Sequence, residues 1–324
     1  MTKKILIIFL SLLCSIVFIA NNSFAGWTQA KGHAYNQLTY GYYTSNSKYT
    51  TVEKDASHNN TGLGGGKEKV EASQFVAYGV TYYGEYGLVD SLTIFTTIPW
   101  KAVESADTLR YSDRWGPSGI GDIDLGLRYN LTQSFLGGPL SLQGTVKIPE
   151  AYEYGNPLST LSLGDGQYDA TLALVYGRGL GKGYAVLNAG YKYRFENDKY
   201  YTFKPSDQVK VSLSGGYQIS PKFGLGANVD WTRSVGNATV SDELVRANYA
   251  YGGKASEQDN LLIRDSLGLE QQVLNVGASL IYNLPLKNTQ LVLSYAVDVR
   301  GAWIFETRDA GVGETYNAGL VYTF

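Results

Sequence analysis

Hydrophobic and polar residues alternate with a period of two in twelve segments of this 324-residue chain. In the clearest segment, apolar Ile123, Leu125 and Leu127 alternate with Asp124 and Gly126. Successive side chains of a β-strand point to opposite faces, so this alternation predicts strands with one apolar and one polar face. The segments cover roughly residues 33–44, 73–86, 91–100, 122–131, 140–148, 167–177, 183–195, 207–219, 222–235, 271–284, 289–302 and 313–324.

Short and long connections alternate between these segments. The short ones lie near 87–90, 134–138, 178–182, 220–222 and 285–288. The longer ones lie near 45–72, 101–118, 149–166, 196–206 and 236–270, with a shorter one at 303–312. This regular phase predicts an up-and-down antiparallel sheet with all its tight turns at one end. We expect 45–72, which contains a run of glycines, to be a mobile loop.

The last segment has a distinctive ending. Tyr316, Ala318, Leu320, Tyr322 and Phe324 share one face, opposite small and polar residues. An apolar face that ends in aromatic residues is typical of a strand that crosses a membrane within a β-barrel. The ending also resembles the terminal strand of bacterial outer-membrane proteins, in which the barrel assembly machinery recognises the final aromatic residue. That resemblance implies that Tyr322 and Phe324 are an assembly signal.

The first 25 residues have the composition of a secretory signal peptide. Lys3 and Lys4 precede an apolar run over residues 5–20, and Ser23–Ala25 has the small residues of a cleavage site. We therefore predict a cleaved signal peptide at 1–25 and a single barrel domain at 26–324. The only cysteine, Cys14, lies in the signal, so the mature chain has no disulfide.

The remaining composition fits a transmembrane barrel. The chain has 27 tyrosines, 38 glycines and a mean hydropathy of −0.16. A membrane protein without long apolar helices can span only as a closed barrel, and tyrosines suit the aromatic girdles at its two interfaces. We predict an all-β, twelve-stranded antiparallel barrel in the outer membrane of a Gram-negative bacterium, with both termini periplasmic because the strand number is even. A soluble, tyrosine-rich secreted β-protein is the alternative.

Charged residues of both signs fall on the polar faces of the predicted strands. We expect these residues to line the interior: Glu85, Asp122, Asp124, Arg128, Lys147, Asp169, Lys192, Arg194, Lys210, Asp230, Asp298 and Arg300. They could pair across strands and stabilise the wall, or some could form a constriction that selects solutes by charge. The mixture of signs argues against a strong cation or anion filter.

The sequence carries little sign of other chemistry. Outside the signal only His33 and His58 are histidines, and neither shows the His-x-Ser spacing of outer-membrane phospholipases. We therefore predict no enzymatic activity, no cofactor and no metal site. The net charge of −2 offers no basic patch for nucleic acid, so none is expected as a partner.

One stretch resembles a known family. Residues 119–129, Gly-Ile-Gly-Asp-Ile-Asp-Leu-Gly-Leu-Arg-Tyr, are similar to the signature of an outer-membrane transport family named for the meta-cleavage pathway of phenol degradation. Residues 147–149 and 163–169 resemble a second element of such barrels. The resemblance covers roughly 119–324, and it implies a channel for hydrophobic or aromatic compounds without catalytic residues.

Taken together, these patterns predict an outer-membrane channel for passive or facilitated passage of small solutes. Its expected partners are outer-membrane lipids, the assembly machinery and a small-molecule solute. Two alternatives stay open: a non-conducting barrel whose extracellular loops, 45–72 and 236–270, bind a partner, and a lipid-modifying barrel enzyme.

Overall fold

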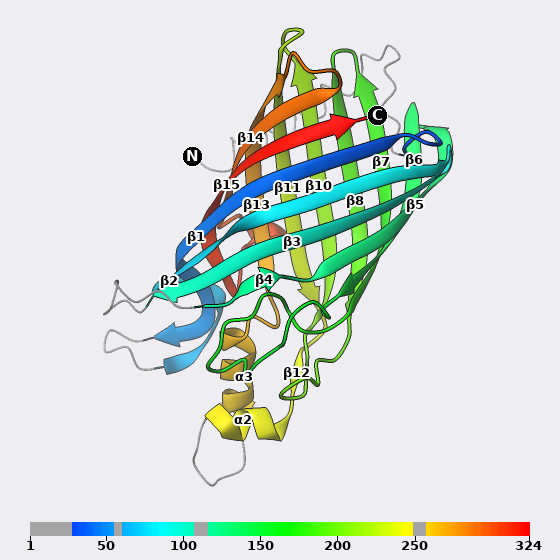
Figure 1. The fold of residues 1–324 in the computed structure, drawn as a ribbon. Helices are drawn as coiled ribbons and strands as arrows, with labels where there is room; N and C mark the ends of the chain where they lie inside the picture. The colour runs from blue at the N-terminus through cyan, green and yellow to red at the C-terminus, as the bar shows by residue number, and fades with distance from the viewer. Residues whose placement is uncertain (1–27, 55–59, 107–115, 249–256) are drawn as a thin grey trace.

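Twelve long antiparallel strands close into a barrel in the computed structural model, which describes residues 28–54, 60–106, 116–248 and 257–324 (Figure 1). They are β1 (Ala34–Lys54), β2 (Asn60–Val89), β3 (Leu92–Ala106), β5 (Ile123–Phe135), β6 (Gly138–Ile148), β7 (Asp169–Leu180), β8 (Gly183–Arg194), β10 (Asp207–Gln218), β11 (Phe223–Val235), β13 (Gln272–Asn283), β14 (Thr289–Val299) and β15 (Ala310–Thr323). The short β4 (Ser118–Ile120) pairs with β3. Because β1 pairs with both β15 and β2, the sheet has no open edge between its first and last strands. The predicted number and order of strands are confirmed.

The apolar faces of the strands form the outer surface. Leu125 and Leu172 are 45% and 58% exposed, as expected for side chains that point away from the interior. Large aromatic side chains are exposed near both ends of the strands: Tyr86, Tyr129, Phe135, Tyr217, Phe223 and Tyr322 at one end, and Trp100, Tyr168, Tyr193, Phe195, Tyr295 and Tyr316 at the other. This apolar belt between two aromatic girdles is the surface of a membrane-spanning barrel. Among the described residues, no helix is long and apolar enough to cross a membrane.

The start of β1 and the last residue of β15 lie at the same end of the barrel. The backbone amides of Ala34 and Phe324 each donate a hydrogen bond to the carbonyl of the other, at 2.9 and 3.1 Å. The five tight turns lie at this end too, in the predicted phase. That this end faces the periplasm stays a prediction.

The opposite end differs from the expectation at 45–72. Where the structure describes this segment it is strand: β1 continues to Lys54 and β2 begins at Asn60, so the two strands extend well past their neighbours. Threonine, tyrosine and valine in this segment favour extended backbone. The strand pattern is hidden in the sequence because strands that extend beyond the lipid have no reason to carry an apolar face.

The longer connections at this end fold into a cap. It contains β9 (Phe203–Lys204) paired with β12 (Thr239–Val240), and the helices α2 (Asp242–Asn248) and α3 (Glu257–Ser266). Figure 1 shows these elements beyond the end of the barrel that lies opposite the C-terminus. The cap has a small apolar core, whose buried members are Phe203, Ala238, Leu244, Ile263 and Leu269. The predicted 236–270 connection is therefore largely structured where the structure describes it.

Candidate functional site

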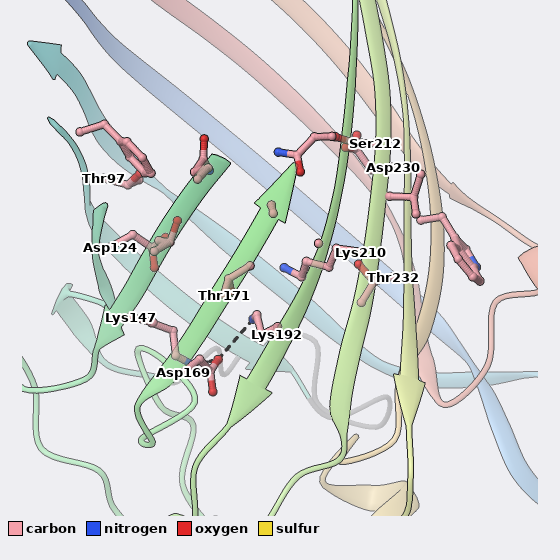
Figure 2. Close-up of a pocket in the computed structure, with 18 of the residues that line it drawn as sticks. Thr97, Asp124, Lys147, Asp169, Thr171, Lys192, Lys210, Ser212, Asp230 and Thr232 are labelled. Carbon is pink, nitrogen blue, oxygen red and sulfur yellow. Dashed lines mark hydrogen bonds and ion pairs between the residues drawn. The ribbon is translucent and has the colours of Figure 1, made fainter. Parts of the chain in front are cut away.

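A polar cavity of about 450 Å³ lies inside the barrel. Its charged lining residues are three lysines, Lys147, Lys192 and Lys210, and three aspartates, Asp124, Asp169 and Asp230. They come from six neighbouring strands, β5 to β8, β10 and β11, and each lies on the polar face of its strand (Figure 2). The alternation of the sequence therefore places charges of both signs around one interior space.

Asp169, the first residue of β7, is the centre of an ion-pair network at the cap end of this cavity. Its carboxylate lies 2.8 Å from Lys147 Nζ, 3.2 Å from Lys192 Nζ and 3.6 Å from Arg194 Nε. The Asp169 side chain is only 1% exposed, and those of Lys147 and Arg194 are about 10% exposed. Three cations therefore share one buried carboxylate, so they need further anions nearby.

The connection between β6 and β7 supplies one of these anions and binds to the wall. Asp165 lies 2.6 Å from Lys147 Nζ and 3.3 Å from Arg194 Nη2. Asp122, just before β5, accepts hydrogen bonds from the Tyr152 hydroxyl at 2.6 Å and from the Asp165 amide at 3.0 Å. These contacts attach the connection 149–168 to the barrel rim by charged and hydrogen-bonded groups.

The attachment of the connection 149–168 to the barrel rim should withstand mild acid. The Lys147 and Arg194 cations hold the pKa of the half-exposed Asp165 carboxyl well below its usual range. A carboxyl with a lowered folded pKa contributes stability above its unfolded pKa of about 3.9, and loses it as pH falls through the folded value. We expect 149–168 to stay attached from pH 7 to about pH 4 and to detach only in stronger acid.

Amide hydrogen exchange measures this directly. The Asp165 amide donates to Asp122 and the Gly166 amide donates to the Tyr152 hydroxyl at 2.8 Å, so both should be protected while the connection is attached. After correction for intrinsic exchange rates, protection should be constant between pH 7 and pH 5. The variant Asp165→Asn should lose it at neutral pH. Loss of protection in the wild-type chain between pH 7 and pH 5 would contradict the assignment.

Three charged side chains of the cavity have no ion-pair partner among the residues that the structure describes. They are Asp124 on β5, Lys210 on β10 and Asp230 on β11. The Lys210 ammonium lies beside that of Lys192, and both interact electrostatically with Asp124. Asp230 faces the same space and accepts a hydrogen bond from the Asn228 side chain. Three of the six charged side chains that line the cavity therefore lack an ion pair with another described residue of the wall.

Aromatic side chains form the wall of the cavity nearer the chain ends. Tyr83 and Phe95 both line it, with ring centroids 6.4 Å apart. Phe95 points inward because Gly126 on the adjacent strand leaves room: a Cβ there would lie 2.1 Å from the Phe95 ring. The Arg128 guanidinium lies 5.4 Å from the centre of the same ring. The interior thus has a charged region near the cap and an aromatic region nearer the C-terminus.

Beyond the aromatic region, toward the end of the barrel that holds the C-terminus, residues before β1 contact side chains of the interior. Arg128 forms an ion pair with Glu85 at 3.0 Å. The Gln29 side-chain amide donates to the other Glu85 oxygen at 2.7 Å, and the Gln29 backbone amide donates to Thr93 Oγ1 at 2.7 Å. Glu85 and Arg128, both predicted interior residues, are therefore brought together outside the charged cavity.

The structure separates two further predicted residues from the cavity. Asp298 accepts hydrogen bonds from Asn275 at 2.9 Å and from the Gly313 amide at 3.2 Å. Arg300 was expected in a strand, and this expectation is wrong: β14 ends at Val299 and Arg300 is exposed in the following connection, so its place in the interior stays a prediction. Gly301 has a φ of +65° and its position closely approaches the Phe305 carbonyl, so the chain turns away there.

Sequence reasoning missed several residues that shape the cavity. Asp165 and Tyr152 lie in a connection, where period-two alternation carries no information. Tyr83 and Phe95 are aromatic residues that lie on strand faces expected to be polar. For Phe95 the sequence did contain a signal: Ile94 and Ile98 lie on the apolar face of their strand, so Phe95 lies on the opposite, inward face. In the described part of the chain, no group of three or more His, Cys, Asp or Glu side chains could hold a metal ion.

Comparison with known proteins adds the fold context. No protein-family model matches the chain, and no curated protein sequence matches it. Among solved structures, the COG4313 outer membrane channel from Pseudomonas putida F1 has a TM-score of 0.66 at 17% identity, covering 94% of this chain and all of that one. The translocator domain of the autotransporter NalP from Neisseria meningitidis has a TM-score of 0.48 at 11% identity, covering 99% of this chain and 95% of that one.

At these identities the likeness concerns the fold. Closure of twelve antiparallel strands, an apolar belt with two aromatic girdles and the overlap with the Pseudomonas channel agree with one another. The chain has the fold of a bacterial outer-membrane β-barrel.

Proposed function

We propose that this protein is an outer-membrane channel for small solutes. The observation that carries the proposal is the polar cavity of about 450 Å³, which is lined by charges of both signs inside a closed barrel. Its volume lies in the usual range for sites that accommodate small molecules. The similar fold of the Pseudomonas putida barrel, which is described as an outer membrane channel, supports the same function.

Hydrophobic or aromatic solutes are the finer form of this proposal. The family resemblance of residues 119–129 implies them, and Tyr83 and Phe95 supply an aromatic wall. The six charged side chains at the cap end favour polar groups on the solute as well. We therefore propose solutes that combine polar groups with apolar carbon, rather than pure hydrocarbons.

Planar-bilayer recording tests the proposal. We expect the refolded chain to give steady single-channel currents in potassium chloride, with weak preference between cation and anion because the cavity has three lysines and three aspartates. A folded barrel that leaves the bilayer closed would refute the channel. It would instead favour a non-conducting barrel whose structured cap, with its own apolar core, binds an outside partner.

We also propose that the final strand acts as an assembly signal. Tyr322 and Phe324 are both about half exposed on the outer face, with ring centroids 5.9 Å apart. Phe324→Ser removes one exposed ring, so the loss of burial is small compared with the loss of recognition. We expect outer-membrane levels to fall sharply, measured by fractionation and immunoblotting, whereas Phe223→Ser, at an exposed girdle position at the same end, should have little effect. Wild-type levels of Phe324→Ser would refute the signal.

A further inference from the structure

Asp124 and Lys210 face each other across the cavity without forming an ion pair. In the ring of strands, β5 and β10 are four steps apart, separated by β6, β7 and β8. Figure 2 shows the Asp124 carboxylate and the Lys192 and Lys210 ammonium groups directed into the same space from different sides. The wall therefore holds these two opposite charges apart, and the lysines between them, Lys147 on β6 and Lys192 on β8, are ion-paired with Asp169.

The other lysines of the cavity are already paired with carboxylates, and Asp230 accepts a hydrogen bond from the Asn228 side chain. Lys147 and Lys192 both contact Asp169, and Lys147 also contacts Asp165. Lys210 is thus an excess cation beside Lys192, and Asp124 is an excess anion on the facing wall. Separated charges in an enclosed space are costly unless a partner satisfies both.

A solute with a single charge would form a favourable contact with only one of the two groups, Lys210 or Asp124. An anion at Lys210 would be repelled by Asp124, and a cation at Asp124 would meet the ammonium groups of Lys192 and Lys210. A solute with one charge of each sign contacts both sides favourably. The side chains of Thr171, Ser212 and Thr232 also line this space and can donate or accept hydrogen bonds.

We propose that the cavity is a binding site for small zwitterionic solutes. The anionic group of the solute lies against Lys210 and Lys192, its cationic group lies against Asp124, and its carbon chain spans the gap. The inference rests on the proposed channel function and names the class of solute that the channel holds. The aromatic wall of Tyr83 and Phe95 next to this space would contact the apolar part of a larger zwitterion.

Binding to the refolded full-length barrel in detergent tests the inference without requiring conduction. The probes are 4-aminobutyrate and its two singly charged analogues, butyrate and butylammonium, titrated by saturation-transfer difference NMR. We expect 4-aminobutyrate to bind at least about tenfold more tightly than either analogue, because each charged contact contributes separately to affinity. Equal affinities for the three probes would overturn the proposal.

Three variants locate the site. Lys210→Met and Asp124→Asn each remove one charge with little change of shape, and each should reduce the affinity for 4-aminobutyrate to that of the singly charged analogues. Lys222→Met, in the exposed β10–β11 turn, is the matched control and should leave binding unchanged. Circular dichroism confirms folding, and the comparison of probes on the wild-type chain stands even if a variant fails to fold.

The outcomes separate this inference from the channel proposal. Tight butyrate binding that strengthens in Asp124→Asn would indicate a simple anion site and overturn the zwitterion proposal. Unchanged binding in both variants would overturn the location. A barrel that conducts in potassium chloride but shows no preference for 4-aminobutyrate refutes this inference alone. One that binds 4-aminobutyrate without conducting refutes the channel alone.

Discussion

Replacing Leu125 by arginine should lower the free energy of unfolding of the barrel by about 2–4 kcal/mol. Leu125 lies on the outer face of β5, and its neighbours across the sheet are Thr96 and Val146. Its side chain is 45% exposed on the apolar belt, where the bilayer would replace water around it. A guanidinium there must either lie in hydrocarbon or reach for the interface, and both cost free energy.

Asn275→Arg is the matched control on the inner face. Asn275 donates a hydrogen bond to the Asp298 carboxylate at 2.9 Å, so an arginine at this position meets an anion rather than lipid. We expect a change of less than about 1 kcal/mol, because a charge on the polar interior is far cheaper than one in the bilayer. Reversible urea unfolding in lipid vesicles measures both variants. Equal destabilisation would mean that the assigned faces are wrong.

Asp169→Asn should be the most damaging single change in the interior, at about 3–5 kcal/mol. The variant leaves Lys147, Lys192 and Arg194 around a neutral amide in a place where the Asp169 side chain is 1% exposed. Removing Asp169 leaves Lys192 without an anion in contact in the described part of the chain, and an uncompensated buried charge is strongly destabilising. Lys147 and Arg194 keep Asp165 at the rim. The same unfolding titration measures the loss.

A second substitution and a surface control identify the cause. Adding Lys192→Met to Asp169→Asn should recover part of the loss, because one uncompensated cation is removed. Glu150→Gln, which breaks the exposed pair with Lys199, should have little effect. If Asp169→Asn were as mild as Glu150→Gln, water in the interior would be solvating these cations and the network would contribute little.

The interior of the barrel has a charged region near the cap and an aromatic region nearer the C-terminus. Ion pairs to Asp165 attach the connection 149–168 at the cap end, while Phe95 and Tyr83 present rings toward the chain ends. Lys48 on the extended part of β1 also pairs with Asp265 of α3 at 3.2 Å, so the cap is held by charges from more than one side. The cap and the cavity are therefore physically connected.

The sequence by itself determined the strands, their faces and the phase of the turns. Leu125 points outward and Asp124 inward because side-chain direction alternates strictly along a strand, and this rule needs only neighbouring residues. The even number of strands and the alternation of short and long connections then sufficed to predict an up-and-down closed sheet. The same local rule failed at Arg300, where the strand ends one residue before it.

Only the tertiary structure decided which of these inward charges meet. Asp169 pairs with Lys147, Lys192 and Arg194 because strand pairing brings β6, β7 and β8 into one register, and Asp165 joins them from a connection with no alternating pattern. Asp124 and Lys210 remain apart because closure of the barrel sets them on different sides of the lumen. Distances across a lumen depend on the tilt and stagger of all twelve strands together, and no local pattern in the chain encodes them.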